Sequence, residues 1–222
     1  MIEYYQRNAI EMALSDCKKN DLIILSDVDE LPDPYIIKNI KSISVKHKWN
    51  KKYFTFWWNN IYQDVRFILP KKSIYDYLSY DAIVLRQKLY YYYLNCQSKG
   101  VWNGSIIIRY GNLGKYGHLQ KLRDARYDLP YVDGGGWHFS YLGGTQAIKI
   151  KLNSIVDKSS TIQKIMEELS DDEYIEDCMK YGKDIFGRTG KEFEYEFVTA
   201  DALGLPNIEK IIMEKPHLWR NC

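Results

Sequence analysis

The sequence has few of the features that mark disulfide scaffolds, zinc sites or membrane spans. Its four cysteines, Cys17, Cys96, Cys178 and Cys222, form no C-x-x-C pair, and no histidine spacing completes a zinc site. We therefore expect reduced thiols. No apolar run approaches the about 18 residues that cross a bilayer, and the opening MIEYYQRN lacks the hydrophobic region of a signal peptide. The chain is expected to be cytoplasmic, without a transmembrane segment.

An excess of charge of one sign is also missing. Lys and Arg number 31 against 29 Asp and Glu, for a formal net charge of +2, and lysines are interspersed with acids. This pattern favours neither a nucleic acid nor a membrane surface as partner. No internal repeat or low-complexity linker divides the 222 residues. We expect one domain over 1–222, with an α/β core in 1–144 and a mainly helical part in 145–222.

Aromatic residues, in contrast, are abundant, with 20 tyrosines and six tryptophans. Aromatic planes with polar edges suit sugar faces as well as protein cores. A genome biased toward Lys, Asn, Ile and Tyr codons explains the same composition, so both interpretations stay open.

The most informative stretch is 21–32, DLIILSDVDELP. Its short apolar run is typical of a buried strand and stops at Asp27 and Asp29. Residues two apart in a strand point to one side, about 7 Å apart, so the carboxylates are predicted to converge at the carboxyl end of the strand, where open α/β sheets bind ligands. Two carboxylates beside solvent suit Mn²⁺ or Mg²⁺ and, through the metal, a diphosphate. A turn with a helix N-cap is the alternative.

The second informative stretch is 131–144, YVDGGGWHFSYLGG. Its three consecutive glycines allow close backbone approach to a ligand or positive φ. The aromatic residues then alternate with His138 and Ser140, which predicts a strand with these two side chains on one face. A ligand role and a structural role for His138 both remain open.

Periodicity predicts the other elements. Helices are predicted at 4–20, 34–43, 118–126, 145–155, 161–169, 172–181 and 207–215. Strands are predicted at 52–62, 82–85, 88–96, 105–110 and 193–197, with a turn at 102–104 and loops at 111–117 and 182–190. Residues 63–80 show no clean period. The basic residues of 118–126, Lys121 and Arg123 among them, predict either phosphate contacts or a solvated basic face.

Several segments occur in a set order along most of the chain: QRNAI, DLIILSDVDELP, KLYYYYLNC, VWNGSIII, QKLRDAR, GGWHFSYLGG and DIFGRTG. In order and rough spacing they resemble glycosyltransferase family 17, which includes the β-1,4-mannosyl-glycoprotein 4-β-N-acetylglucosaminyltransferases. GGWHFSYLGG after SDVDELP is the most specific part. The resemblance implies an α/β, GT-A-like nucleotide-sugar transferase fold that lacks its N-terminal strands and has a helical C-terminal part.

The resemblance also implies an activity. The expected reaction is metal-dependent, inverting transfer of a sugar, N-acetylglucosamine in the first place, from a UDP-sugar such as UDP-GlcNAc to a glycan or other saccharide acceptor. Asp27 and Asp29 would hold Mn²⁺ or Mg²⁺ against the diphosphate, and His138 would complete the metal site. Such a transfer has an oxocarbenium-like transition state, a diphosphate leaving group and an acceptor hydroxyl that loses a proton.

A carboxylate that faces the sugar is the expected base. Asp133 is the first candidate, and Glu30 or Asp128 could serve instead. Other residues are expected around donor or acceptor because they offer stacking surfaces, amide hydrogen bonds, bare backbone or positive charge: Trp102, Asn103, Gly104, Gly135, Gly136, Trp137, Lys121 and Arg123. For Trp137, a place in the core is the stronger interpretation.

The chain departs from the family in two places. Relatives carry further N-terminal residues that form the first strands of the nucleotide-binding sheet, so a partner chain could supply them here. Where relatives tend to have a Ser-His-x-Glu-like sequence, residues 153–157 are NSIVD. A non-catalytic carbohydrate- or nucleotide-sugar-binding fragment of the same fold is therefore the main alternative function.

A haloacid-dehalogenase phosphatase is the other enzyme class in which an apolar strand ends in D-x-D. Those enzymes need Thr or Val where this chain has Leu31, and a late strand ending in two acids. The adjacent acid pair here, Asp171-Asp172, begins a predicted helix. The sequence therefore disfavours this class.

Overall fold

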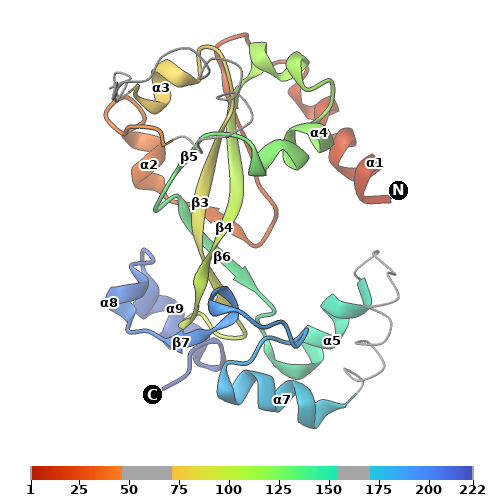
Figure 1. Cartoon of the computed structure of the whole chain (residues 1–222), viewed down its shortest axis with the longest axis vertical. Coiled ribbons are helices and arrows are strands. Elements are labelled where there is room, and N and C mark those ends of the chain that lie inside the picture. The colour runs from red at the N-terminus through yellow and green to blue at the C-terminus, as the bar shows by residue number, and fades with distance from the viewer. Residues whose placement is uncertain (1, 47–71, 155–170, 222) are drawn as a thin grey trace, which may run out of the picture.

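A mixed sheet with helices on both faces forms the frame of the molecule (Figure 1). The computed structural model describes residues 2–46, 72–154 and 171–221. Within these ranges seven strands pair in the order β1-β4-β3-β6-β2, with β5 added to β3 and β7 to β4. The strands are β1 (Leu22–Leu25), β2 (Glu30–Pro32), β3 (Ile83–Tyr91), β4 (Cys96–Arg109), β5 (Tyr131–Val132), β6 (Gly136–Ser140) and β7 (Tyr195–Phe197).

The helices gather at the two ends of the long β3–β4 hairpin (Figure 1). At the upper end lie α1 (Ile2–Ala9), α2 (Pro34–Lys38), α3 (Ile74–Tyr77) and α4 (Leu119–Asp124). At the lower end lie α5 (Gly144–Ser154), α7 (Asp172–Tyr181), α8 (Ala200–Leu203) and α9 (Ile208–Glu214). Short 3₁₀ helices are η1 (Ile10–Leu14), η4 (Tyr110–Lys115), η5 (Ala125–Tyr127), η6 (Lys191–Phe193) and η7 (Pro216–Leu218).

The core is apolar on both faces of the sheet because side chains alternate along β3 and β4. Ile83 and Leu85 pack with buried residues of α2 and α3. Val84 and Ile106 point to the opposite face and pack against α4. At the lower end, Tyr91 of β3 packs with α5 and α7, and Trp137 and Phe139 of β6 pack with α8 and α9. The sheet is thus covered on both faces, as expected for an α/β protein.

Predictions for the C-terminal part are largely confirmed. The helices expected at 145–155, 172–181 and 207–215 are α5, α7 and α9. The bounds of α7 match because its ends carry strong signals: the Asp171 side chain accepts a hydrogen bond from the backbone of Glu173, and Gly182 ends the helix with a φ of 61°. The helix at 118–126 is present as α4 and η5.

The turn predicted at 102–104 is wrong, because these residues lie inside β4. Trp102 and Asn103 are paired with Gln87 and Arg86 of β3. The register shifts nearby, between Val84 and Arg86 of β3. The glycine in this stretch is therefore part of an irregular β-ladder and does not end the strand.

The hairpin turn lies instead inside the strand predicted at 88–96. β3 continues unbroken from the predicted strand at 82–85 and ends at Tyr91. Tyr92 then adopts a φ of 65°, and β4 begins at Cys96. Aromatic residues favour strands, but a left-handed backbone conformation at Tyr92 breaks the strand after Tyr91.

Other predicted elements are shorter than expected. The helix at 4–20 ends at Ala9 and is followed by η1, and the helix at 34–43 ends at Lys38. The strand at 193–197 is reduced to β7. Residues 74–77, within a stretch without a clear period, form α3. The strand at 52–62 and the helix at 161–169 lie outside the described residues.

The α/β class is therefore confirmed, whereas the GT-A-like arrangement and its missing N-terminal strands stay a prediction. The C-terminal part is mainly helical, and its strand β7 joins the common sheet through β4. In the described ranges, no helix combines the length and the apolar character that are needed to span a bilayer.

Two glycines allow β6 to reach its neighbours. A Cβ on Gly135 would lie 2.6 Å from Cβ of Leu85, and one on Gly136 would lie 2.0 Å from the carbonyl oxygen of Leu31. Gly136 also has a φ of 129°. The predicted close backbone approach is present, but the partner is the chain's own β2 and β3, so Gly135 and Gly136 position β6 in the sheet.

We expect Gly136→Ala to destabilise the protein by about 3 kcal/mol, since it adds a clash with Leu31 and a disfavoured φ at one position. Gly114→Ala is the matched control, because a Cβ there has no heavy atom within 4 Å. Urea unfolding monitored by tryptophan fluorescence measures both. Equal stabilities of the two variants would contradict the proposed packing role.

Candidate functional site

The D-x-D segment forms the loop between β1 and β2. Asp27 closes this loop through a hydrogen bond from the backbone N–H of Glu30 to its carbonyl oxygen, 3.0 Å long. The predicted apolar strand is present as β1, but the chain turns after it, and Asp27 and Asp29 lie in the loop between β1 and β2. Their carboxylates bind different cations, so the predicted convergence of the pair on one spot does not occur.

Asp27 faces the upper end of the molecule. Its carboxylate pairs with Arg123 of α4, at 2.7 Å, and with Arg7 of α1, at 3.1 Å. The Arg123 side chain is only 1% exposed, and it also donates to the carbonyl oxygen of Gly104 at 2.7 Å. Asp27 thereby joins α1, α4 and β4 at the loop.

Glu30 is the main partner of Arg123. The Glu30 side chain has no exposed surface and contacts the guanidinium through both carboxylate oxygens. Burial by itself would lower the pKa of Arg123, but the hydrogen bonds and charges of Glu30 and Asp27 raise it. Arg123 is therefore held as a cation in the interior, and neither the predicted phosphate contact nor a solvated basic face describes it.

Glu30 also accepts hydrogen bonds from the indole N–H of Trp102, at 2.6 Å, from the backbone N–H of Asp27, at 3.2 Å, and from the Ser105 hydroxyl, at 3.4 Å. Its oxygens are thus fully engaged with the protein. This environment is that of a structural ion pair, and it is unsuited to the general base that we considered for Glu30. Trp102 donates its indole N–H to the Glu30 carboxylate of this pair. The centroids of the Trp102 and His138 rings lie 4.6 Å apart in an edge-on arrangement.

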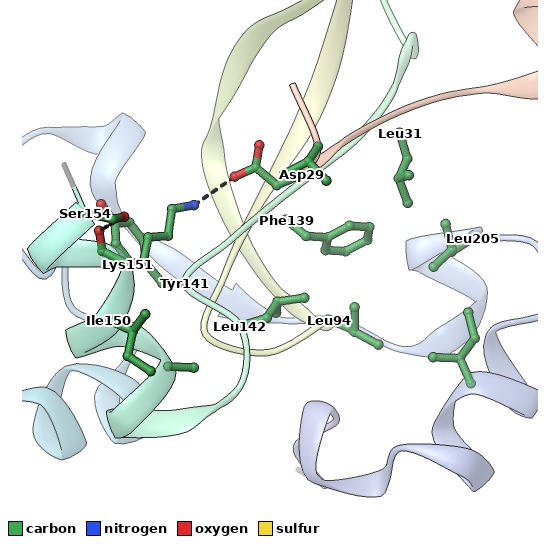
Figure 2. Close-up of a pocket in the computed structure, with 13 residues that line it drawn as sticks. Asp29, Leu31, Leu94, Phe139, Tyr141, Leu142, Ile150, Lys151, Ser154 and Leu205 are labelled. Atoms are coloured by element: carbon green, nitrogen blue, oxygen red, sulfur yellow. Dashed lines mark hydrogen bonds and ion pairs between the residues drawn. The ribbon is translucent and has the colours of Figure 1, made fainter. Parts of the chain in front are cut away.

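Asp29 faces the lower end and makes a second ion pair (Figure 2). Lys151 of α5 lies 2.8 Å from Oδ2 of Asp29, and Nε2 of His138 lies 3.4 Å from the same oxygen. Burial opposes ionisation of Asp29, but the hydrogen bonds and charges of His138 and Lys151 hold its pKa well below the usual range. Lys151 also donates to the Ser140 hydroxyl at 3.0 Å.

The predicted face with His138 and Ser140 is confirmed, since both contact the Asp29–Lys151 pair from β6. The position of β6 explains this: it pairs with β2, with His138 opposite Glu30, and the N–H of Phe139 donates to the Asp29 carbonyl at 2.9 Å. His138 is buried, and its Nδ1 has no hydrogen-bond partner among the described residues.

A pocket of about 690 Å³ opens beside this second ion pair. Asp29 and Lys151 lie on one side of it, and apolar side chains from β2, β6 and α9 surround the rest (Figure 2). The volume lies in the range of about 300–1,000 Å³ that is typical of small-molecule sites. A charged pair at the edge of a pocket of this size is the strongest candidate for a functional site in the described residues.

The residues present do not fit the predicted Mn²⁺ or Mg²⁺ site. Within the described ranges, no group of three or more His, Cys, Asp and Glu side chains is placed to hold a metal ion. Asp27 pairs with two guanidinium groups and Asp29 with an ammonium. A metal would have to displace these cations, so metal binding stays a prediction.

The first predicted base lies elsewhere. The Asp133 carboxylate pairs with Lys46 at 2.7 Å and Arg86 at 3.3 Å. Burial opposes ionisation of Asp133, but these two cations lower its pKa. Arg86 also donates to Asn103 at 3.3 Å. Asp133, which follows β5, and Asn103 of β4 are thus joined through Arg86 of β3, and neither lines the pocket beside Asp29.

The remaining residues predicted for the site lie in the core, within a strand or on the surface. Trp137 is a core residue, 6% exposed, and its indole N–H donates to the Leu203 carbonyl at 2.8 Å. Gly104 lies within β4, where a Cβ would meet the Gln87 side chain at 1.9 Å. Lys121 and Asp128 are exposed, and neither lines the pocket.

Sequence reasoning missed Lys151 and Arg7. Lys151 is one of two lysines in α5, and no spacing in the sequence distinguishes it from Lys149, which pairs with Asp172. Arg7 lies in the QRNAI segment, but its contact with Asp27 depends on how α1 packs against α4. The signal for Lys151 is its place on the helix that follows GGWHFSYLGG.

Comparison with known proteins identifies no relative: no family model matches this chain, and no curated protein or solved structure is significantly similar to it.

Arg123→Met should destabilise the protein by about 3–5 kcal/mol, because it leaves the buried Glu30 carboxylate without its cation. Arg7→Met is the comparison: Arg7 is 12% exposed and also donates to Gln120, but its partner Asp27 is 40% exposed and keeps Arg123, so a smaller loss of about 1–2 kcal/mol is expected. The double variant Arg123→Met/Glu30→Met should lose less stability than the sum of the losses in Arg123→Met and Glu30→Met. Urea unfolding tests this, and strict additivity would contradict the buried pair.

The stability contributed by Asp29 should depend on pH. Its pKa is lowered in the folded state, so the contribution is present above the unfolded value of about 3.9 and disappears as pH falls through the lower folded value. Lys151→Met should cost about 1 kcal/mol or less at pH 7, since the lysine is 37% exposed. The difference from wild type should shrink as pH falls below the unfolded value of about 3.9.

Urea unfolding of wild type and Lys151→Met between pH 2 and 7 measures this dependence. Lys121→Met is the control, because its side chain is exposed on α4. A stability difference for Lys151→Met that is the same at every pH would show that the loss comes from packing and not from the charge of Asp29.

Proposed function

We propose that the chain is a glycosyltransferase that moves a sugar, N-acetylglucosamine in the first place, from a UDP-sugar to a saccharide acceptor at the pocket beside Asp29. One observation carries the proposal. The two segments that most specifically resemble glycosyltransferase family 17 are more than 100 residues apart, yet β2 and β6 place them side by side, with Glu30 opposite His138. Fold alone would not support the proposal, since function depends on the site.

Lys151 supplies positive charge at the edge of the pocket. Its side chain is 37% exposed, so a ligand can reach the ammonium without unfolding α5. An anionic diphosphate that contacts Lys151 would compete with Asp29 for it. Lys151 is therefore the residue to which we assign donor binding, in place of Lys121 and Arg123.

Asp29 is the one carboxylate among the described residues that line the pocket. We assign to it the hydrogen bond to the acceptor hydroxyl and the acceptance of its proton. When Lys151 turns toward the diphosphate, Asp29 loses a hydrogen bond and a charge that lower its pKa. Its pKa then rises, which makes it a better base at the moment the donor is bound.

A non-catalytic sugar- or nucleotide-sugar-binding role is the second candidate. It is favoured by the ion pairs of the D-x-D segment, because cations of the same chain occupy both carboxylates. A partner chain that completes the sheet is part of this alternative. In the described residues β1 pairs with β4 alone, so its other edge could accept a strand.

Calorimetric titration with UDP and UDP-GlcNAc, each in Mn²⁺ and in chelator, tests the proposal. Wild type should bind UDP-GlcNAc and release UDP when an acceptor is present. Asp29→Asn should reduce the turnover by at least about tenfold if the carboxylate accepts the proton. Lys151→Met should weaken binding of UDP itself.

Asp16→Asn is the matched control, because Asp16 is exposed and remote from the pocket lining. Binding without turnover for any saccharide would favour the non-catalytic role. Failure of UDP and UDP-GlcNAc to bind in either condition would contradict the transferase. Binding in Mn²⁺ that is lost in chelator would show that a metal displaces the cations from the D-x-D segment.

A further inference from the structure

The pocket beside Asp29 has a polar end and an apolar end. Asp29, Lys151 and Ser154 are the charged and hydroxyl residues that line it, and the Tyr141 ring lies beneath the Lys151 ammonium. Figure 2 shows Lys151, Ser154 and Tyr141 together on one side, next to Asp29. The opposite side is formed by aliphatic and aromatic side chains: Leu31, Leu94, Phe139, Leu142 and Leu205.

A saccharide alone would match only the polar end. Each hydroxyl that leaves water needs a hydrogen-bond partner, and an unpaired one costs more than the burial returns. The apolar end offers such a hydroxyl no partner among its described side chains. A sugar ring therefore fits beside Asp29 and Lys151, and a hydrocarbon group fits beyond it.

The rim of the pocket also favours an apolar group of a ligand. Ile150 of α5 is 71% exposed and Leu31 of β2 is 43% exposed, although both line the pocket. Apolar side chains that remain exposed around one cavity are typical of a binding site. Leu31 lies on the apolar side and Ile150 on the side of Lys151 (Figure 2), so an alkyl chain at the apolar end would cover part of the Leu31 surface.

We propose that the pocket binds an amphipathic glycoside, with its sugar at Asp29 and Lys151 and an alkyl aglycone at the apolar end. The inference rests on the proposed function and specifies its acceptor: a saccharide attached to a hydrocarbon chain, as in a glycolipid, and not a free oligosaccharide. Asp29 then faces the sugar hydroxyls, and the aglycone sets the position of the sugar.

The affinity for alkyl glycosides should rise with chain length. Each buried methylene strengthens binding about fourfold, so hexyl β-D-glucoside should bind at least about tenfold more tightly than methyl β-D-glucoside. Calorimetry with the methyl, butyl, hexyl and octyl glucosides, each below its critical micelle concentration, measures this dependence on the full chain.

Variants at the rim separate this pocket from non-specific adsorption. Ile150→Gln and Leu31→Gln replace exposed apolar residues, so the fold should persist, and circular dichroism checks this. Leu31→Gln, at the apolar end, should reduce the gain in affinity from methyl to hexyl glucoside by at least about half on a logarithmic scale, and Ile150→Gln, on the side of Lys151, should reduce it less. Met12→Gln is the control: Met12 is 77% exposed and lies on η1, outside the pocket lining. It should keep the wild-type gain.

No gain with chain length, or an equal gain in all four proteins, would overturn the proposal. Self-association of wild type that Leu31→Gln abolishes would also overturn it, because the apolar end would then bind a second copy of the chain. The outcome is independent of the UDP titration. Chain-length dependence without UDP binding would refute the transferase and support the amphipathic ligand. UDP binding without chain-length dependence would support the transferase and refute the amphipathic ligand.

Discussion

The buried ion pair between Arg123 and Glu30 is the interaction on which the arrangement of the site depends. It joins α4 to the start of β2 in a place without exposed side-chain surface, where a lone charge would cost several kcal/mol, of the order of 3–5. The guanidinium also binds Gly104 of β4 and Asp27. One side chain therefore connects the helix α4, the strand β4 and the D-x-D loop, and it leaves the loop little freedom to move.

This connection separates the roles of the two aspartates. Asp27 is drawn to the upper end of the molecule by Arg123 and Arg7, whereas Asp29 pairs with Lys151 at the lower end. The first carboxylate belongs to the framework, and the second belongs to the pocket. Three carboxylates around the loop are matched by three cations, so the loop carries no net negative charge that would attract a further cation. This charge balance favours an anionic ligand that takes the place of Asp29 beside Lys151.

The pocket combines this exchangeable ion pair with an apolar end from β2, β6 and the C-terminal helices. Its lining comes from both ends of the sequence, since the D-x-D loop provides Asp29 and α9 provides Ile211. Strand β6 makes this possible: it runs parallel to β3 and antiparallel to β2. Gly135 and Gly136 allow that close approach, so backbone geometry and ligand chemistry are linked at the same strand.

Local patterns in the sequence determined the α/β class, the strand before D-x-D, the helices α5, α7 and α9, and the shared face of His138 and Ser140, because each depends on periodicity, capping or alternation within a few residues. The turn expected at Trp102–Gly104 was wrong because pairing with β3 overrides a local glycine signal. Only the tertiary structure decided which cation each carboxylate binds. Arg7, Arg123 and Lys151 are separated from Asp27 and Asp29 by up to 122 positions, and ion pairs over such separations follow from packing and burial, which no local pattern encodes.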